Sequence, residues 1–256
     1  MWEAYVVAAE EGVALLVSLY ILATHPPHQH EAYASPYAFR TPPSGFKRLF
    51  HVFCIVYFTL VQTVDIVHSH GHCVFFYTTW NYVAQIFFWC WSLADRKGVS
   101  RLRLVLFDVL FPVSIFVVIV VWGILLPMAM HTHEEALLLN WVSFSQHGIN
   151  TVLLLVDGLW SDSRAVAWST GALSVLWPLI YCIFAWIVHN ASAQGFWPYP
   201  FLAIDHPDAP LWYLMLVLGQ VLIFWFTWGI ASMRVRAASH KRVDTEALTQ
   251  LLDVTA

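Results

Sequence analysis

Apolar stretches of about 20 residues recur along nearly the whole chain, with only short polar connections between them. A helix of that length spans the roughly 30 Å hydrocarbon core of a bilayer. The composition agrees, because 59% of the residues are hydrophobic and only 11% are charged, far from the usage of a water-soluble domain. The sequence therefore predicts a multi-pass integral membrane protein of the plasma membrane or an endomembrane, in contact with membrane lipids. The 12 Lys and Arg residues form no long basic run, so no nucleic-acid partner is expected.

These stretches predict an all-α fold, a polytopic transmembrane helix bundle. A transmembrane β-barrel would need alternating segments of about ten residues, and an open sheet would leave backbone groups unpaired in lipid. Seven spans are expected, at residues 7–23, 49–68, 74–94, 104–126, 137–159, 166–188 and 211–233. The bundle then occupies residues 1–233. Residues 234–256 form a cytoplasmic tail, in which Asp244 or Thr245 can cap a short helix.

The basic residues predict the orientation of the bundle. With seven spans, all 12 Lys and Arg residues fall on one side of the membrane. They lie between spans one and two, three and four, and five and six, and after span seven. Because cytoplasmic loops carry an excess of Lys and Arg, the N-terminus is expected outside and the C-terminus in the cytoplasm. Six spans would scatter these charges over both sides.

Polar side chains inside the predicted spans are costly in hydrocarbon, so each is a candidate functional residue. Thr78, Asn81 and Gln85 follow one another at helical spacing and share one face of the third span. The other candidates belong to the second, fifth and sixth spans and to the connection after the sixth: Asp65, His147, Asn150, His189 and Tyr199. Most of this set lies in the outer half of the membrane, where we expect a pocket.

Thr78 and His147 supply the chemistry of a nucleophile and a general base. A histidine titrates near neutral pH and can take the proton of a threonine hydroxyl as it attacks an ester carbonyl. Water would then release the acyl group from the threonine. Asp157 is not expected to orient His147, because ten helical residues separate them by about 15 Å along the axis. Asp65 and Asn81 are better placed for that role.

A turn between the second and third spans is rich in histidine. His68, His70 and His72 are ligand types for zinc or copper. Their spacing does not match a zinc signature, so polar loop residues are the simpler interpretation. We expect no metal ion and no other cofactor.

Several segments resemble the androgen-induced and androgen-dependent family of multispan membrane proteins. They are Phe-Pro-Val-Ser-Ile-Phe-Val-Val at 111–118 followed by Trp122, His-Gly-Ile-Asn at 147–150 with an acidic residue ten positions after the histidine, and Trp-Pro-Tyr-Pro-Phe-Leu at 197–202. The resemblance covers about residues 48–233. Members of that family are threonine hydrolases of fatty acid esters of hydroxy fatty acids (FAHFA). Their nucleophile lies in a pattern similar to residues 78–85, which implies Thr78, or its neighbour Thr79, as nucleophile and His147 as the catalytic histidine.

The sequence therefore predicts an intramembrane threonine-type hydrolase of lipid esters, an enzyme of lipid metabolism. Three alternatives stay open. Alignment on the histidine-glycine pair places Asn150 at the catalytic position, which implies an inactive protein. The extra N-terminal span resembles the rolling stone proteins, relatives linked to myoblast fusion, which suggests a non-enzymatic role through partners in adhesion or fusion. A transporter or channel is disfavoured, because paired broken helices are lacking in the hydropathy.

Overall fold

The computed structural model describes residues 2–29, 44–97, 100–161 and 163–254. Helices account for nearly all regular structure in these ranges, which contain no strand, so the predicted all-α fold is confirmed. The long helices are α1 (Trp2–Thr24), α3 (Gly45–His68), α4 (Tyr77–Ala94), α5 (Arg101–Val120), α9 (Thr170–Ala191) and α10 (Ala209–Val254). Short 3-10 helices occur in the connections, namely η1 (Pro27–Gln29), η3 (His72–Phe75), η5 (Glu135–Leu137) and η7 (Pro200–Leu202).

Two of the predicted spans contain a π-helix. The first continues from α5 through the π-helix η4 (Val121–Leu125) into α6 (Leu126–Thr132). The second begins with α7 (Trp141–Phe144), passes through the π-helix η6 (Ser145–Ile149) and ends with α8 (Asn150–Trp160). A π-helix adds a residue to one turn and shifts the faces of the helix on either side of it, and it often occurs at functional sites.

Five helical segments are long and apolar enough to cross a membrane: Trp2–Thr24, Gly45–His68, Arg101–Thr132, Thr170–Ala191 and Ala209–Ser239. The other two predicted spans, which correspond to α4 and to residues 141–160, are not among the helices that are long and apolar enough. Polar side chains such as Asn81 and Gln85 lower the apolarity of α4, and the π-helix divides residues 141–160 into three short pieces. The multi-pass membrane character is thus supported by five helices.

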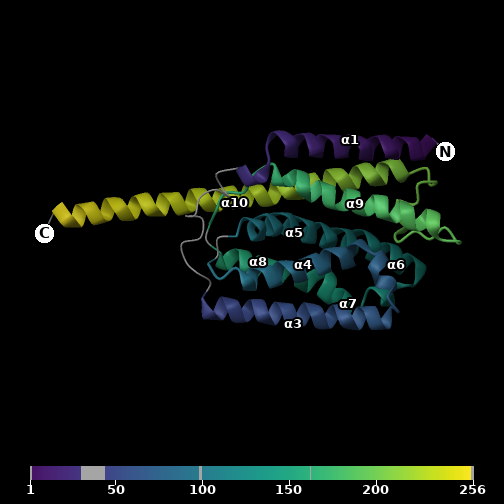
Figure 1. The fold of residues 1–256 in the computed structure, drawn as a ribbon, viewed down its shortest axis with the longest axis horizontal. Coiled ribbons are helices and arrows are strands. Elements are labelled where there is room, and N and C mark those ends of the chain that lie inside the picture. Colours follow the sequence, from purple (N-terminus) through teal and green to yellow (C-terminus); the bar gives the residue numbers. More distant parts are fainter. Residues whose placement is uncertain (1, 30–43, 98–99, 162, 255–256) are drawn as a thin grey trace.

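The helices lie side by side along the long axis of the molecule (Figure 1). α5 is central, because it contacts α4, α8, α9 and α10. One hydrophobic cluster joins α5 to α1, α4, α9 and α10, with Val7, Val113 and Tyr213 fully buried. A second cluster joins α5 to α3, α4 and α8, with Phe58 and Leu154 fully buried. Both clusters include residues of α4, which therefore lies at their boundary.

Ion pairs hold the helices together at the end of the bundle where the basic residues gather. The carboxylate of Asp157 on α8 accepts hydrogen bonds of 2.8 Å from His51 Nε2 on α3 and from an Arg103 guanidinium nitrogen on α5. Lys47 Nζ lies 3.5 Å from the same carboxylate. Arg164 pairs with Asp108 beside this network. Asp157, Arg103 and His51 are all buried, so the network fixes three helices in register.

The C-terminal helix is longer than predicted. α10 runs to Val254 without interruption and extends well beyond the bundle (Figure 1). The prediction of a separate short helix that starts at Asp244 or Thr245 is wrong, because that segment continues the helix that begins at Ala209.

The Asp157 network generates a prediction of stability. Asp157→Ala should lower the free energy of unfolding by about 3–5 kcal/mol, because it leaves Arg103 and His51 buried without their acceptor. Thermal unfolding of the detergent-solubilised protein measures the change. Asp208→Ala is the matched control, because the side chains of Asp208 and His206 are 66% and 64% exposed. Equal melting temperatures for both variants would contradict this account.

Candidate functional site

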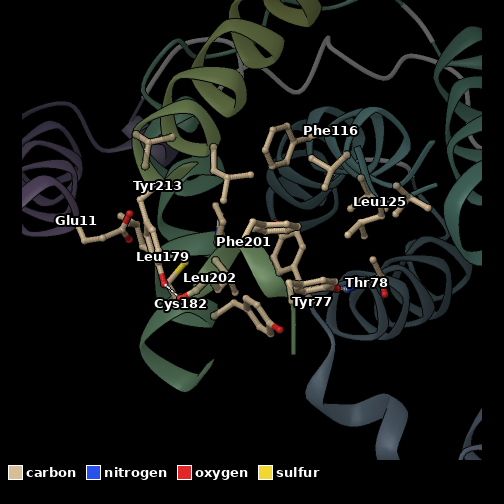
Figure 2. A pocket seen from close by; sticks show the side chains of 18 residues that line it. Glu11, Tyr77, Thr78, Phe116, Leu125, Leu179, Cys182, Phe201, Leu202 and Tyr213 are labelled. Atoms are coloured by element: carbon tan, nitrogen blue, oxygen red, sulfur yellow. Dashed lines mark hydrogen bonds between the residues drawn. The ribbon is translucent and has the colours of Figure 1, made fainter. Parts of the chain in front are cut away.

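A largely apolar cavity lies inside the bundle at the N-terminal end of α4 (Figure 2). Its walls come from α1, α4, α5, α9, α10 and the segment around η7. Its free volume is about 60 Å³. Small-molecule sites measure about 300–1,000 Å³, so the cavity has room for one group of a ligand and not for a whole ligand.

Thr78 and Tyr199 meet at one end of this cavity. The backbone N–H of Thr78 donates to the hydroxyl oxygen of Tyr199 over 3.5 Å. Phe76 and Phe201 hold the Tyr199 ring, with ring centroids 5.6 and 5.3 Å away. Burial raises the pKa of Tyr199 to about 12, and hydrogen bonding with Thr78 opposes that rise. Tyr199 is therefore a neutral phenol at physiological pH and can donate its proton to a bound group.

The structure separates the two neighbouring threonines. Thr78 lines the cavity, whereas Thr79 is buried and does not line it. Of the two candidate nucleophiles, Thr78 is the one that a molecule in the cavity can contact.

The buried side chains that have polar atoms without a hydrogen-bond partner in the described part of the chain include four predicted site residues of α4, η6 and α8. Both amide atoms of Asn81 and of Gln85 are unpaired, as are Nδ1 of His147 and Nδ2 of Asn150. Buried polar groups in proteins are nearly always paired, so such a group indicates an absent water or ligand. These four residues form a polar cluster on α4, η6 and the start of α8.

Contacts between helices place this polar cluster at one depth in the bundle. The Phe58 ring of α3 stacks on Tyr82 of α4, with centroids 4.3 Å apart. Tyr57, the neighbour of Phe58, shares a 2.7 Å hydrogen bond with Ser145 of η6. Residues near 82 and near 145 therefore lie at the same level of α3, and α4 contacts η6 directly. Asn81 and His147 lie within about one helical turn of each other along the bundle axis.

His147 itself is held by its backbone. Its carbonyl accepts a 2.7 Å hydrogen bond from Trp122 Nε1, across from η4. The carbonyl is available because η6 is a π-helix, in which the regular hydrogen-bond pattern shifts. The side chain of His147 is buried and is not part of the lining of the Thr78 cavity. The cavity and the polar cluster are thus neighbouring features that share α4.

Two other predicted site residues have different contacts from those expected. Asp65 accepts a 2.7 Å hydrogen bond from Gln146 Nε2, so it orients Gln146 and not the adjacent His147. The ring of His189 stacks on Trp197 at a centroid distance of 4.0 Å and does not line the cavity.

The histidine-rich turn gains no support as a metal site. Across the described residues, no group of three or more His, Cys, Asp or Glu side chains has an arrangement that could hold a metal ion, and this includes His68, His70 and His72.

One residue of the site was missed in the sequence. Glu11 of α1 lines the cavity at the end opposite Thr78 (Figure 2). The signal was present, because an acidic residue inside a predicted span, here residues 7–23, is costly in lipid and marks a functional candidate.

Comparison with known proteins identifies the family. A family model described as FAR-17a/AIG1-like protein matches residues 44–232, most of the chain. This match confirms the predicted resemblance to the androgen-induced family. No curated protein and no solved structure matches the chain. The matched segment begins next to the start of α3, so α1 lies outside it.

The polar cluster generates a prediction about stability. Gln85→Leu should lower the free energy of unfolding by less than Gln146→Leu, because the Gln85 amide has no partner among the described residues and loses at most a bound water. Gln146→Leu is the matched control and should lower it by about 1–3 kcal/mol, since it leaves Asp65 without its hydrogen-bond donor. Thermal unfolding in one detergent compares the two. Equal losses of stability would show that Gln85 is paired with another residue in the folded protein.

Proposed function

The chain belongs to the FAR-17a/AIG1-like family, and from that premise we propose that it hydrolyses lipid esters within the membrane, with Thr78 as nucleophile and His147 as general base. The observation that carries this proposal is the position of Thr78. Thr78 lines an apolar cavity beside the Tyr199 phenol. The buried imidazole of His147, whose Nδ1 has no partner among the described residues, lies on the neighbouring helical segment η6.

The first half of the reaction forms an acyl-enzyme. The Thr78 hydroxyl oxygen attacks the ester carbonyl carbon while its proton passes to His147. The Tyr199 hydroxyl lies beside Thr78 and donates to the carbonyl oxygen as negative charge develops there. Collapse of the tetrahedral intermediate breaks the ester bond, and the leaving alkoxide takes the proton from His147 to become a free hydroxyl group.

The second half needs a water molecule, and the polar cluster is suited to hold one. A buried water requires two to four polar partners. The unpaired atoms of Asn81, Gln85 and Asn150 offer such partners next to His147. His147 takes a proton from this water, and the hydroxide attacks the acyl-threonine carbonyl carbon. Collapse of the intermediate breaks the bond to the Thr78 oxygen, which takes the proton back from His147, and the carboxylic acid is released.

The cavity favours an apolar substrate. Its lining is dominated by aliphatic and aromatic side chains, which bind acyl chains by excluding them from polar surroundings. The family resemblance narrows the class to fatty acid esters of hydroxy fatty acids. Such an ester partitions into the bilayer and can reach a site between helices from the side.

We also propose the seven-span topology with the N-terminus outside. α4 and residues 141–160 lie alongside the five apolar helices, and α5 contacts both α4 and α8 (Figure 1). The ion pairs among Lys47, Arg103 and Asp157 gather basic residues at the end from which α10 projects, which supports a cytoplasmic location of that end.

A second function has one specific observation in its favour. Asn150 is fully buried with an unpaired amide nitrogen, and it occupies the position that the histidine-glycine alignment assigns to the catalytic histidine. An amide cannot act as a general base. In that case the chain is a non-enzymatic member of the family that acts through partners.

A labelling experiment tests the hydrolase. The purified protein should react with a fluorophosphonate probe, and Thr78→Ala and His147→Ala should each reduce labelling at least 100-fold, since nucleophile and base act as a unit. The labelled residue is identified by peptide mass spectrometry.

Thr79→Ala is the matched control and should keep its labelling, because Thr79 does not line the cavity. Asn150→His supplies a second comparison. Labelling that appears only in Asn150→His would assign the natural chain to the non-enzymatic function.

The topology has its own test. Single cysteines placed at Glu134 and at Ser163, in a chain whose own cysteines are replaced, should differ in their reaction with a membrane-impermeant maleimide on intact cells. The cysteine at 134 should react before permeabilisation and the one at 163 only after it. Equal reactivity of the two positions would exclude the proposed arrangement.

A further inference from the structure

Of the 18 described residues that line the cavity, Glu11 is the only one with an acidic or basic side chain of the Asp, Glu, Lys or Arg type. Its side chain is nine-tenths buried against the bundle, on a helix that otherwise presents mostly apolar residues. It lies nine residues from the start of α1, or about 13 Å along the helix axis. Since the predicted first span begins at residue 7, Glu11 lies about 6 Å inside that span.

No hydrogen bond or ion pair to the Glu11 side chain is found in the described part of the chain. The Tyr213 hydroxyl, which lines the same cavity, is occupied, because it donates to the carbonyl of Leu202 over 2.9 Å and accepts from Trp186 over 2.8 Å. Among the described residues, no basic side chain lines the cavity. A carboxyl group in such surroundings is costly unless it has a partner, and intramembrane acids commonly mark substrate or ion sites.

The cavity also has a route for a ligand from the lipid. A second, wider groove runs between α1, α9 and α10. Val217 lines both this groove and the cavity, and the groove contains Glu10, the neighbour of Glu11. The groove walls are apolar, with Val13, Val175 and Trp225 among them. A lipid chain in the groove therefore lies next to the cavity at the level of Glu11.

We propose that Glu11 binds the hydrogen-bond-donating end group of a single-chain lipid that enters the cavity from the groove. The end group is a hydroxyl or an amine, because both donate to a carboxyl oxygen. The alkyl chain then lies along the apolar walls of the groove, whose free volume of about 570 Å³ exceeds the 60 Å³ of the cavity. The inference rests on the cavity and on Glu11, not on hydrolysis.

Binding of three matched C16 compounds tests this. Hexadecanol and hexadecylamine each carry a donor, whereas hexadecyl methyl ether has almost the same shape and none. The shift in melting temperature of the full-length, detergent-solubilised protein gives an apparent Kd for each compound. Wild type should bind at least one donor compound roughly tenfold more tightly than the ether, the factor expected for one hydrogen bond.

Three variants locate the effect. Glu11→Leu should bind all three compounds equally, and Glu10→Leu, which changes the neighbouring acid in the groove, should keep the wild-type preference. Glu11→Gln separates the two end groups. It should keep a preference for hexadecanol, which needs only an acceptor, and lose a preference for hexadecylamine, which needs a negative charge.

The proposal is overturned if wild type binds the ether as tightly as both donor compounds, or if the preference survives in Glu11→Leu. The melting temperature of each variant without ligand shows that it is folded. None of the compounds is an ester, so the result is independent of turnover at Thr78. Failure of the probe to label Thr78 would leave this site standing, and failure of this site would leave the hydrolase standing.

Discussion

Hydrocarbon offers no hydrogen-bond partner, and this constraint decides how the polar residues of the bundle are arranged. At the basic end, the Asp157 carboxylate is paired with His51 and Arg103 and lies near Lys47. Each member satisfies the others, so three helices come together in one register. A buried network of this kind is sensitive to the loss of one member, because the remaining charges cannot find water. The hydrophobic clusters pack the helices, and the network fixes how they align.

In the opposite half of the bundle, several buried polar side chains are not satisfied by neighbouring residues in this way. Asn81, Gln85 and Asn150 are fully buried, yet amide atoms of each lack partners among the residues that the structure describes. Apolar residues would pack in these positions at less cost. The same α4 helix carries Thr78 one turn away, at the wall of the cavity. Polar side chains without partners beside an apolar cavity are expected of a site that binds a mostly apolar molecule and recognises one polar group of it.

The sequence predicts those features that depend on neighbouring residues. The predicted third span ends at residue 94, where α4 ends, and the predicted second span ends at residue 68, where α3 ends. Apolarity and charge act locally, so these boundaries can be read from a short window. The shared face of Thr78, Asn81 and Gln85 follows from helical spacing alone.

Features that depend on packing were not predictable. The π-helix at Ser145–Ile149 has no local signature, and it determines how His147 and Asn150 are oriented. The pairing of Asp65 with Gln146 in place of His147 depends on which residue that π-helix turns toward α3. The continuity of α10 through residue 244 overrides a good capping residue, because capping preferences are worth only about 1 kcal/mol.

The contribution of α1 follows from where the family segment begins. Residues 44–232 contain Thr78, Tyr199 and His147, the residues to which the proposed hydrolysis assigns a role. They do not contain Glu11, which reaches the cavity from α1, a helix packed against α9 and α10. Without α1 this side of the cavity would face lipid, and no charged group would line it. The residues of the proposed hydrolysis thus lie within the family segment, whereas the proposed end-group site at Glu11 lies on α1 outside it, so the two proposals concern parts of the chain that can change independently.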